Sequence, residues 1–325
     1  MIAYLMRRLL YAIPILIGVN LLTFALFFMV NTPDDMARMQ LGVKRVTPEA
    51  IEDWKRERGY DRPLFVNASS EGSARFTDTI FFDKSVRLFA FDFGFSDDGR
   101  DIGREIRERM GPSLAIALPV FVLGLFAYVC AALLLVFFRQ TPLDLAGVIA
   151  CVVLMSVSAM FYIIGGQYLV SKAWRLAPIS GFADGVAMVP FLLLPVVIGV
   201  VAGIGSSTRW YRTIFLDEMD REYVRTARAK GLSEMRVLSG HVLRNAMIPI
   251  LTGVVVVIPS LFLGSLLFES FFGIPGLGSY TIDAINAQDF AVVRAMVFLG
   301  SVLYIVGLVL TDISYTLVDP RVRFE

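Results

Sequence analysis

The sequence contains few residues that could bind a metal or act as a nucleophile. Its 325 residues include two cysteines and one histidine. Cys130 and Cys151 both lie inside apolar stretches, far from acidic or histidine neighbours, so we expect each to serve packing. His241 has no histidine or cysteine near it in the sequence, and we therefore predict no metal site. A helix position at an interface is the simpler interpretation of this histidine.

Charge is also scarce, and its two signs nearly cancel. Charged residues make up 18% of the chain, and the net charge of +1 suggests no nucleic-acid partner. Hydrophobic residues make up 56%, and the mean hydropathy is +0.68. These values exclude a soluble protein of this size, so the sequence predicts an integral membrane protein in contact with a lipid bilayer.

Six apolar stretches are long enough to cross a bilayer, which takes roughly 20 residues each. The first could be taken for a signal peptide because Arg7 and Arg8 precede it, but no small-x-small cleavage site follows it and its apolar length exceeds an ordinary signal core. We therefore expect it to be retained. The predicted spans are residues 9–30, 114–138, 143–169, 186–204, 246–268 and 291–310.

Basic residues predict the orientation of these spans. Arg7, Arg8, Arg139, the basic residues of 207–245 and those near the C-terminus all fall on one side. The opposite segment, residues 269–290, contains no lysine or arginine. By the positive-inside rule, both termini and the 207–245 loop are cytoplasmic, and residues 31–113 form a long extracytoplasmic loop.

The long loop carries local signals of its own. Thr47, Pro48 and Glu49 are typical of a helix start, and Gly59 of its end. Residues 89–95 alternate and end in a glycine, which suggests a short strand or a turn. Residues 101–110 place apolar side chains on one helical face and lead into the second span. The sequence predicts a small ordered cap rather than an independent domain.

No energy source is visible in the chain itself. The predicted spans hold almost no ionisable residue, with Asp144 at one end of the third, whereas ion-coupled carriers place such residues inside the bundle. The chain has no Gly-Lys dipeptide and hence no Walker A loop for nucleotide phosphates. A transporter of this kind must be driven through contact with another chain, and the 207–245 loop is the only sizeable cytoplasmic surface for it.

The 207–245 loop has the pattern of a helix, a glycine turn and a second helix. Apolar residues between Leu216 and Gly231 recur at helical spacing, while arginines fall on another face. Gly231 fits the position after a helix end, and Ser233 fits the cap of the next helix. Two interpretations remain open: an ordinary loop whose arginines fix topology, or a docking helix that transmits motion from a partner.

After the fifth span the chain contains four helix-breaking residues close together. Gly273, Pro275, Gly276 and Gly278 exclude a continuous helix and predict a compact turn. Backbone of this kind near a membrane requires surrounding protein or a water-filled cavity. The turn is either a structural hairpin or a segment lining the outer mouth of a passage, beginning near Glu269.

Two other classes of function are less well supported. An enzyme would need convergent polar groups, but Asp283, Asp289, Asp312 and Asp319 are spread between the outer turn and the C-terminus. Asp319 followed by Pro320 more simply ends the last helix. A self-contained channel or passive facilitator is the second alternative, and it would conduct without partners.

Several motifs resemble one protein family along most of the chain. TARAKGL followed by GHVLRNAMIP is similar to the coupling loop of permease subunits in binding-protein-dependent ABC importers. FFGIPGLG, the later QDF and the ending DISYTLVDPRVR are also typical of the B-type subunits of the dipeptide, oligopeptide and nickel group. Within the long loop, RGYDRPL and FDFGFS resemble the same group. Arg225 stands where an older form of the loop motif has an acidic residue.

The resemblance implies an all-α, six-span permease of the type I importer architecture in the bacterial cytoplasmic (inner) membrane. It implies a homologous C-type permease as partner, two ATPase subunits that bind ATP and Mg²⁺, and an extracytoplasmic solute-binding protein. This chain would bind no cofactor. Peptides are the leading substrate, with nickel or another small solute as alternatives. The implied ATPase-coupling residues are Tyr223, Ala227, Arg228, Gly231, Leu232 and His241, and the implied outer-turn residues are Glu269, Gly273, Pro275, Gly276 and Gly278.

Overall fold

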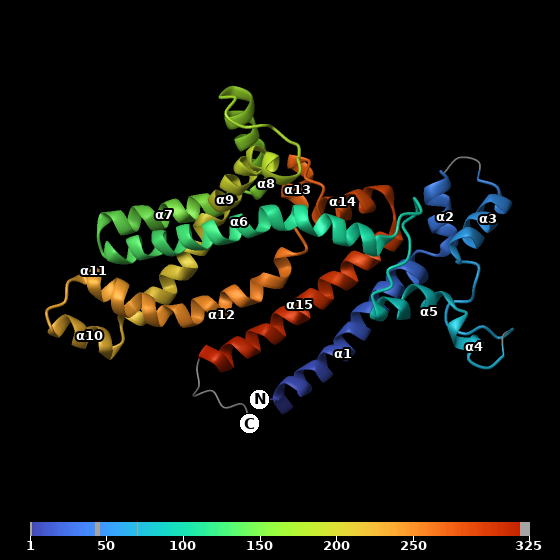
Figure 1. Ribbon diagram of the computed structural model, residues 1–325, viewed down its shortest axis with the longest axis horizontal. Coiled ribbons are helices and arrows are strands. Elements are labelled where there is room, and N and C mark those ends of the chain that lie inside the picture. Colours follow the sequence, from blue (N-terminus) through green and yellow to red (C-terminus); the bar gives the residue numbers. More distant parts are fainter. Residues whose placement is uncertain (1, 43–45, 70, 319–325) are drawn as a thin grey trace. The chain divides into compact units, whose positions relative to one another are not determined.

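The computed structural model describes residues 2–42, 46–69 and 71–318, which are almost entirely helical (Figure 1). Within these ranges there is no β-strand, only an isolated bridge between Phe95 and Asp101. Five helices are long and apolar enough to cross a membrane, and there are up to six such spans if one bent helix pair counts as a crossing. The predicted class, an all-α membrane protein, is confirmed.

The helices alternate between long spans and short connecting pieces. Three π-helical segments, Leu26–Val30, Gln167–Ala173 and Leu238–Val242, and two 3₁₀ segments, Val86–Ala90 and Gly185–Met188, adjoin them. The α-helices are α1 (Ile2–Ala25), α2 (Pro33–Leu41), α3 (Pro48–Arg58), α4 (Ala74–Thr77), α5 (Ile80–Lys84), α6 (Ile102–Phe137), α7 (Pro142–Ser156), α8 (Ala159–Gly166), α9 (Val189–Met219), α10 (Glu222–Ala229), α11 (Glu234–Val237), α12 (Leu243–Leu261), α13 (Leu266–Phe272), α14 (Leu277–Ala287) and α15 (Phe290–Val318).

The chain divides into two compact units. The first unit comprises residues 1–108 and 280–306, and the second comprises residues 109–279 and 307–325. The first unit therefore holds α1, nearly all of the predicted extracytoplasmic loop and the beginning of α15. The second unit holds the remaining long helices and the 207–245 segment.

Local capping builds the small helices of the first unit. Thr32 caps α2, accepting a hydrogen bond from the Asp35 N–H while the Asp35 carboxylate accepts from the Thr32 N–H. Thr47 caps α3 by accepting a hydrogen bond from the Ala50 N–H, with Pro48 at the first helical position. Gly59 ends α3 with φ of 68°, a conformation that favours glycine. The helix predicted from Thr47 to Gly59 is confirmed.

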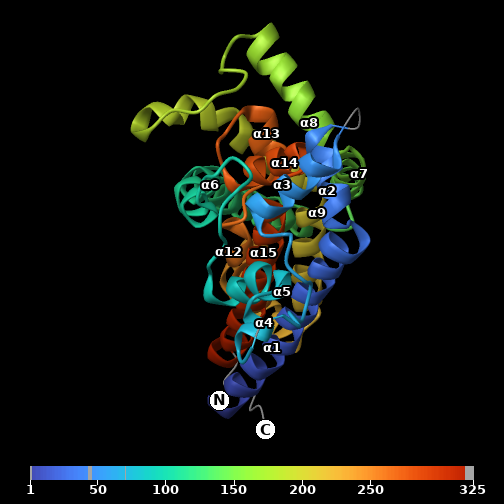
Figure 2. The ribbon, with the colours of Figure 1, turned by 90° about the vertical axis from the view of Figure 1, so that its right-hand side faces the viewer.

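Aromatic side chains form the core of the first unit. Phe28 lies 4.8 Å from Phe24 and 5.3 Å from Tyr60 between ring centroids, and Tyr60 lies 5.5 Å from Trp54. All four are buried. Each such ring removes about 150–250 Å² from water. The cluster therefore ties α1 and its π-helical end to α3, and both views show α1 running beside the first half of α15 (Figures 1 and 2).

The end of the long loop differs in detail from the prediction. Residues 89–95 form the end of a 3₁₀ turn and an irregular stretch, with Phe91 at φ of 58°, and make only the single bridge at Phe95. The turn is thus the correct alternative. Residues 101–110 do not form a separate surface helix, because α6 continues through them without interruption. Ile102 and Ile106 are buried, as their spacing predicts.

Glycines allow the long helices of the second unit to approach closely. A Cβ on Gly203 would lie 2.3 Å from the Tyr128 hydroxyl of α6, and one on Gly199 would lie 2.9 Å from another α6 side chain. A Cβ on Gly205 would lie 2.5 Å from the Cys151 carbonyl oxygen of α7. Small residues are what permits such contacts between spans. Gly199 and Gly203 thus serve close packing between α9 and α6.

The segment predicted as one third span is bent. α7 and the helical segment Ala159–Ala173 meet at 87°. Val157 and Ser158 between them have extended backbone, and the Ser158 hydroxyl accepts a hydrogen bond from the Met160 N–H at the start of α8. Hydropathy did not reveal the bend because residues on both sides of it are apolar.

The remaining spans differ from their predicted limits because helices continue beyond the apolar residues or stop within them. α9 begins near residue 189 and runs on to Met219, which places residues 207–219 of the predicted loop in the same helix as the fourth span. α12 ends at Leu261, seven residues before the predicted end of the fifth span. α15 continues to Val318, and the predicted stop at Asp319 and Pro320 lies outside the described residues.

Candidate functional site

The polar segment between α9 and α11 contains a short helix of its own, α10. The predicted single helix from Leu216 to Gly231 is wrong, because α9 ends at Met219 and the chain turns at Asp220 and Arg221 before α10 begins. The apolar spacing predicted one helix because side chains of two successive helices, α9 and α10, contribute to the same core. Met219 is the last residue of α9 in this core.

The apolar face of α10 is packed inside the second unit. Val224 and Ala227 are 0% and 5% exposed, and they lie in one cluster with Phe215 of α9 and Val237 of α11. The cluster also contains Ala132 and other residues of α6 and α12. α10 is thus part of the same hydrophobic core as the spans.

Gly231 forms the turn after α10. Its φ is 78°, and its N–H donates to the Arg228 carbonyl oxygen at 2.9 Å. The Arg228 guanidinium also spans the turn, since Nε lies 2.9 Å from Oε1 of Glu234 and Nη2 lies 3.3 Å from Oε2. Ser233 then precedes α11 with extended backbone. The predicted order of helix, glycine turn and helix is confirmed.

The six predicted coupling residues do not share one surface. Ala227 is buried in the core cluster, so its small side chain serves internal packing, and Tyr223 and Leu232 are half-buried against the same cluster. Arg228 is engaged with Glu234. Gly231 is exposed, and a Cβ placed on it would meet no atom within 4 Å. His241 is exposed on the π-helical turn. Their roles in coupling remain predictions.

The predicted set included the exposed residues Gly231 and His241 but left out four other exposed side chains of this segment. Arg225, Lys230, Met235 and Arg236 are all exposed on α10, the turn and α11, and the Met235 side chain is among the most exposed apolar groups here at 61%. An exposed basic surface with one apolar residue is the part of this segment that is free to contact another molecule.

The outer turn lies between α13 and α14 and is built around one carboxylate. Glu269 is 1% exposed. Its Oε1 accepts from the Ser265 N–H at 3.0 Å, and its Oε2 accepts from the Ser279 N–H at 3.0 Å. The Ser113 hydroxyl of α6 also hydrogen-bonds Glu269 and accepts from the Leu277 N–H at 2.8 Å. The carboxylate thereby caps the N-termini of both short helices.

Burial is the largest influence on this carboxyl group. It raises the pKa of Glu269 above the usual value, while the N–H donors of Ser279, Ser265 and Gly278 and the Ser113 hydroxyl act in the opposite direction. A buried carboxylate with several donors and no basic partner is well placed to hold backbone together.

The glycines of the outer turn make room for Glu269. A Cβ on Gly276 would lie 2.3 Å from its Oε2, and a Cβ on Gly278 would lie 2.6 Å from the Ser265 carbonyl carbon. Gly273 ends α13 with φ of 64°. The prediction that these residues force a compact turn is confirmed, while a role of Gly273, Pro275, Gly276 and Gly278 in a passage remains a prediction.

A cavity of about 450 Å³ opens inside the second unit between α6, α9, α12 and α13. Its polar lining comes almost wholly from hydroxyl groups, and Glu269 is the one acidic residue among those that line it. No lysine, arginine or histidine contributes to this lining. Among the described residues no group of three His, Cys, Asp or Glu side chains could hold a metal ion. The polar lining residues are Ser113, Tyr128, Ser207, Tyr211, Ser260 and Ser265.

An ion pair that the sequence pattern missed joins the start of α7 to α9. The Arg212 guanidinium contacts both oxygens of Asp144, with Nη2 at 2.8 Å from Oδ2 and Nε at 3.1 Å from Oδ1. Their side chains are only 21% and 12% exposed. An acidic residue at the end of an apolar stretch was the available signal, but its partner is 68 residues away in sequence.

We expect Asp144→Ala to lower the free energy of unfolding by about 3 kcal/mol, because it leaves a largely buried guanidinium unpaired. Thermal unfolding of the purified protein in detergent would measure the change. The double variant Asp144→Leu with Arg212→Met removes both charges and should recover most of the loss. A double variant as unstable as the single one would contradict this explanation.

The chain combines apolar helical spans with a short amphipathic helix, α10, and a cavity lined by hydroxyl groups. These are the features of a multi-span helical permease. Residues 109–324 match the family described as binding-protein-dependent transport system inner membrane component. Residues 1–90 match the N-terminal part described for such membrane components. The chain belongs to this family. It is thus a permease subunit of a binding-protein-dependent ABC importer and not an enzyme, since the ATPase of such importers resides on separate subunits.

Relatives extend over the whole chain. A protein of Brucella abortus strain 2308 described as a peptide transport system permease protein is 32% identical over 332 residues. The dipeptide transport system permease protein DppB of Escherichia coli K12 is 28% identical over 356 residues, and the oligopeptide transport system permease protein AppB of Bacillus subtilis 168 is 28% identical over 342 residues. The alignments cover 100% of this chain and 100% of each relative.

Proposed function

We propose that this chain is one of the two permease subunits of a bacterial peptide importer in the cytoplasmic (inner) membrane. Full-length similarity to proteins named for peptide, dipeptide and oligopeptide transport supports peptides as the substrate. The second permease would be a homologous C-type subunit, and the two would enclose the passage together. A solute-binding protein on the outer side would deliver the peptide.

The observation that carries the coupling proposal is the way in which α10 is held. Its apolar face is buried in a cluster that includes residues of α6, α9 and α12, while Gly231 and the basic residues Arg225, Lys230 and Arg236 remain exposed. A partner ATPase that binds this exposed surface would therefore move the spans directly. ATP and Mg²⁺ would bind to two ATPase subunits and not to this chain.

The proposed orientation follows from the distribution of charge. Both termini and the segment 220–233 would be cytoplasmic, and residues 31–113 would be extracytoplasmic, where the binding protein docks. The small helices of the first unit would form the outer cap. When ATP brings the two ATPases together, the equilibrium between two arrangements of the spans would shift, because these arrangements are close in free energy.

The cavity in the second unit would be this chain's share of the passage. Apart from Glu269, its hydroxyl and apolar lining offers no charged side chain that would favour one peptide side chain over another. It also argues against nickel, because metal capture needs several nitrogen, sulfur or oxygen ligands and the carboxylate of Glu269 is already occupied by its own donors. Selection would then rest with the binding protein.

Reconstitution into liposomes tests the proposal. We expect a labelled dipeptide to accumulate only when this chain, its partner permease, the ATPases and the binding protein are present with ATP. Liposomes with this chain alone, or without ATP, should take up no more than empty ones. Uptake by the chain alone would instead identify a self-contained facilitator, and ATP-driven uptake of nickel but not of dipeptides would replace the proposed substrate.

A further inference from the structure

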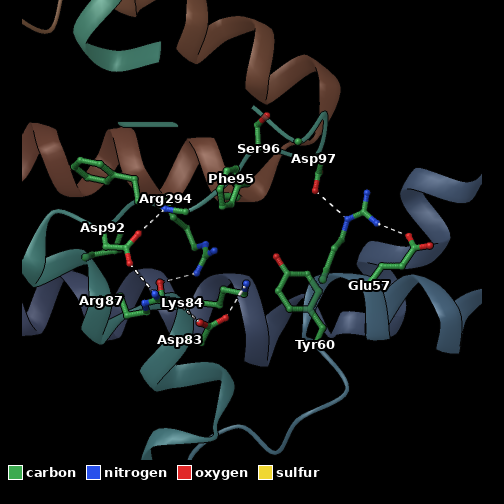
Figure 3. A pocket seen from close by; sticks show the side chains of 16 residues that line it. Glu57, Tyr60, Asp83, Lys84, Arg87, Asp92, Phe95, Ser96, Asp97 and Arg294 are labelled. Atoms are coloured by element: carbon green, nitrogen blue, oxygen red, sulfur yellow. Dashed lines mark hydrogen bonds and ion pairs between the residues drawn. The ribbon is translucent and has the colours of Figure 1, made fainter. Parts of the chain in front are cut away.

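A second cavity, of about 460 Å³, lies entirely within the first unit. It opens between α3, the 3₁₀ segment Val86–Ala90, the irregular stretch that follows, and the start of α15 (Figure 3). Its size falls within the range of roughly 300–1,000 Å³ that is usual for small-molecule sites. Unlike the cavity of the second unit, it is lined by many charged side chains of both signs.

Three of the four cations that line this cavity are paired with carboxylates. Lys84 lies 2.9 Å from Asp83, Arg87 lies 2.9 Å from both Asp83 and Asp92, and Arg58 lies 3.0 Å from Asp97. Burial alone would raise the pKa of Asp83, but Lys84 and Arg87 lower it below its ordinary value. The carboxylates Asp83, Asp92 and Asp97 are therefore already occupied.

Arg294 is the fourth cation, and its surroundings differ. It is 5% exposed, and its guanidinium lies 4.9 Å from the centroid of the Phe28 ring. Nε donates to the Phe290 carbonyl oxygen at 3.2 Å, and Nη1 donates to the Lys84 carbonyl oxygen at 3.0 Å. Within the described part of the chain, Nη2 has no hydrogen-bond acceptor, and no carboxylate lies within 4.0 Å of this guanidinium.

A buried guanidinium without a counter-ion is costly unless an anion joins it. Two neutral carbonyl groups satisfy only part of its five N–H donors. Arginine favours carboxylates because its planar fork matches their two oxygens. Figure 3 shows Arg294 reaching from α15 toward Lys84, among the ion pairs that surround the cavity. Asp83, Asp97 and Asp289 act on the charge of Arg294 from beyond ion-pair distance. Nη2 is thus the donor of this guanidinium that a further carboxylate could bind.

One acidic side chain of the lining has little to bind. Glu57 is 75% exposed at its side chain, and its ion pair is a 3.7 Å contact with Arg58, which is already bound to Asp97. The cavity therefore combines a buried cation that forms no ion pair within 4.0 Å among the described residues with an exposed carboxylate whose one ion pair is long. A molecule that carries a carboxylate and an ammonium group complements both.

We propose that this cavity binds a short peptide, with its C-terminal carboxylate on Arg294 and its N-terminal ammonium near Glu57. The inference rests on the proposed peptide substrate and adds a site in the cap, separate from the cavity among the spans. Such a site would hold a peptide that has left the binding protein. It would recognise the two termini of the peptide and not its side chains.

Binding to the assembled transporter in nanodiscs, without the solute-binding protein, tests this proposal. The probes are trialanine, its C-terminal amide and its N-acetyl derivative, measured by isothermal titration calorimetry. We expect amidation to weaken binding to the wild type by about 10- to 100-fold, as loss of a charge-assisted hydrogen bond would. Acetylation should weaken it by about 2- to 5-fold because Glu57 is exposed.

Two variants assign these effects to residues. In Arg294→Gln, trialanine should bind as weakly as the amide, and amidation should then change little. Glu57→Gln is at the exposed rim and leaves the core intact, so it remains informative if the first variant folds poorly, and in it acetylation should have no effect. Arg62→Gln is the matched control, since Arg62 pairs with Asp78 at 3.3 Å and does not line the cavity.

The outcomes separate this site from the proposed function. Equal affinity of the wild type for trialanine and its amide, or no binding at all, would overturn the site, even if ATP-driven peptide uptake in liposomes is normal. Discrimination that persists unchanged in Arg294→Gln would overturn it as well. Discrimination that depends on Arg294 without any ATP-driven peptide uptake would support the site and contradict the importer proposal instead.

Discussion

Gly231→Trp is expected to reduce ATP-driven uptake by at least about 10-fold, with the protein still inserted in the membrane. The residue sits at φ of 78°, and within 4 Å of the place of its Cβ the described residues contribute no atom apart from its two chain neighbours. A large side chain there meets no obstacle from the chain itself, so any steric effect must come from a docked partner. A 10-fold loss of transport rate corresponds to an increase of about 1.4 kcal/mol in the free energy of activation.

Gly231→Ala separates bulk from backbone strain. Both variants place a side chain at a positive φ, which costs about 1–2 kcal/mol, but alanine adds only a methyl group in open space. We expect the alanine variant to retain most of its uptake, while the tryptophan variant hydrolyses ATP without transport. The measurements are uptake and ATPase activity in the same liposomes, normalised to the amount of inserted permease. Normal uptake by Gly231→Trp at normal abundance would falsify the docking role.

Glu269→Gln is expected to destabilise the outer turn by about 3 kcal/mol and to abolish most transport. Glu269 is 1% exposed, and each carboxylate oxygen accepts from a backbone N–H at 3.0 Å. In glutamine an amide nitrogen replaces one oxygen and faces an N–H donor, so a buried donor loses its acceptor, at a cost of about 1–3 kcal/mol. The negative charge at the N-terminus of α14 is also lost, which adds about 0.3–2 kcal/mol.

Limited proteolysis of the purified permease would report opening of the segment between α13 and α14, and uptake in liposomes would report its effect on transport. Glu108→Gln is the matched control, because Glu108 is 58% exposed at its side chain and pairs with Arg104 four residues away. An exposed pair of this kind contributes little, so this control should behave like the wild type. Equal protease resistance of Glu269→Gln and the wild type would contradict the capping role of Glu269.

Local signals predicted well wherever short-range chemistry decides the structure. Thr47 and Gly59 gave the two ends of α3, and Gly231 and Ser233 gave the turn before α11. Capping and positive φ depend on residues only a few positions apart, so they can be read in sequence. The ends of the long helices could not be read in this way, because α9 continues to Met219 through residues that are no longer apolar.

The candidate sites were only partly predictable for a similar reason. Glycine and proline marked the outer turn, but nothing in the sequence places Ser113 beside Glu269, since 156 positions separate them. The resemblance implied that Ala227 contacts an ATPase, whereas the structure buries it in a cluster that also contains residues of α6 and α9. Hydrophobic periodicity indicates that a helix has an apolar face, not which neighbour covers it.

By itself the sequence determined that the chain lies in a membrane, that it is helical, and that it contains no nucleotide loop of its own, because hydropathy and motif chemistry act over short stretches. Only the tertiary structure decided the 87° bend between α7 and α8, the pairing of Asp144 with Arg212, and the burial of Arg294 beside the cavity of the first unit. Each of these depends on which distant side chains meet, and a charge or a carboxylate shows its role only when its partners are known.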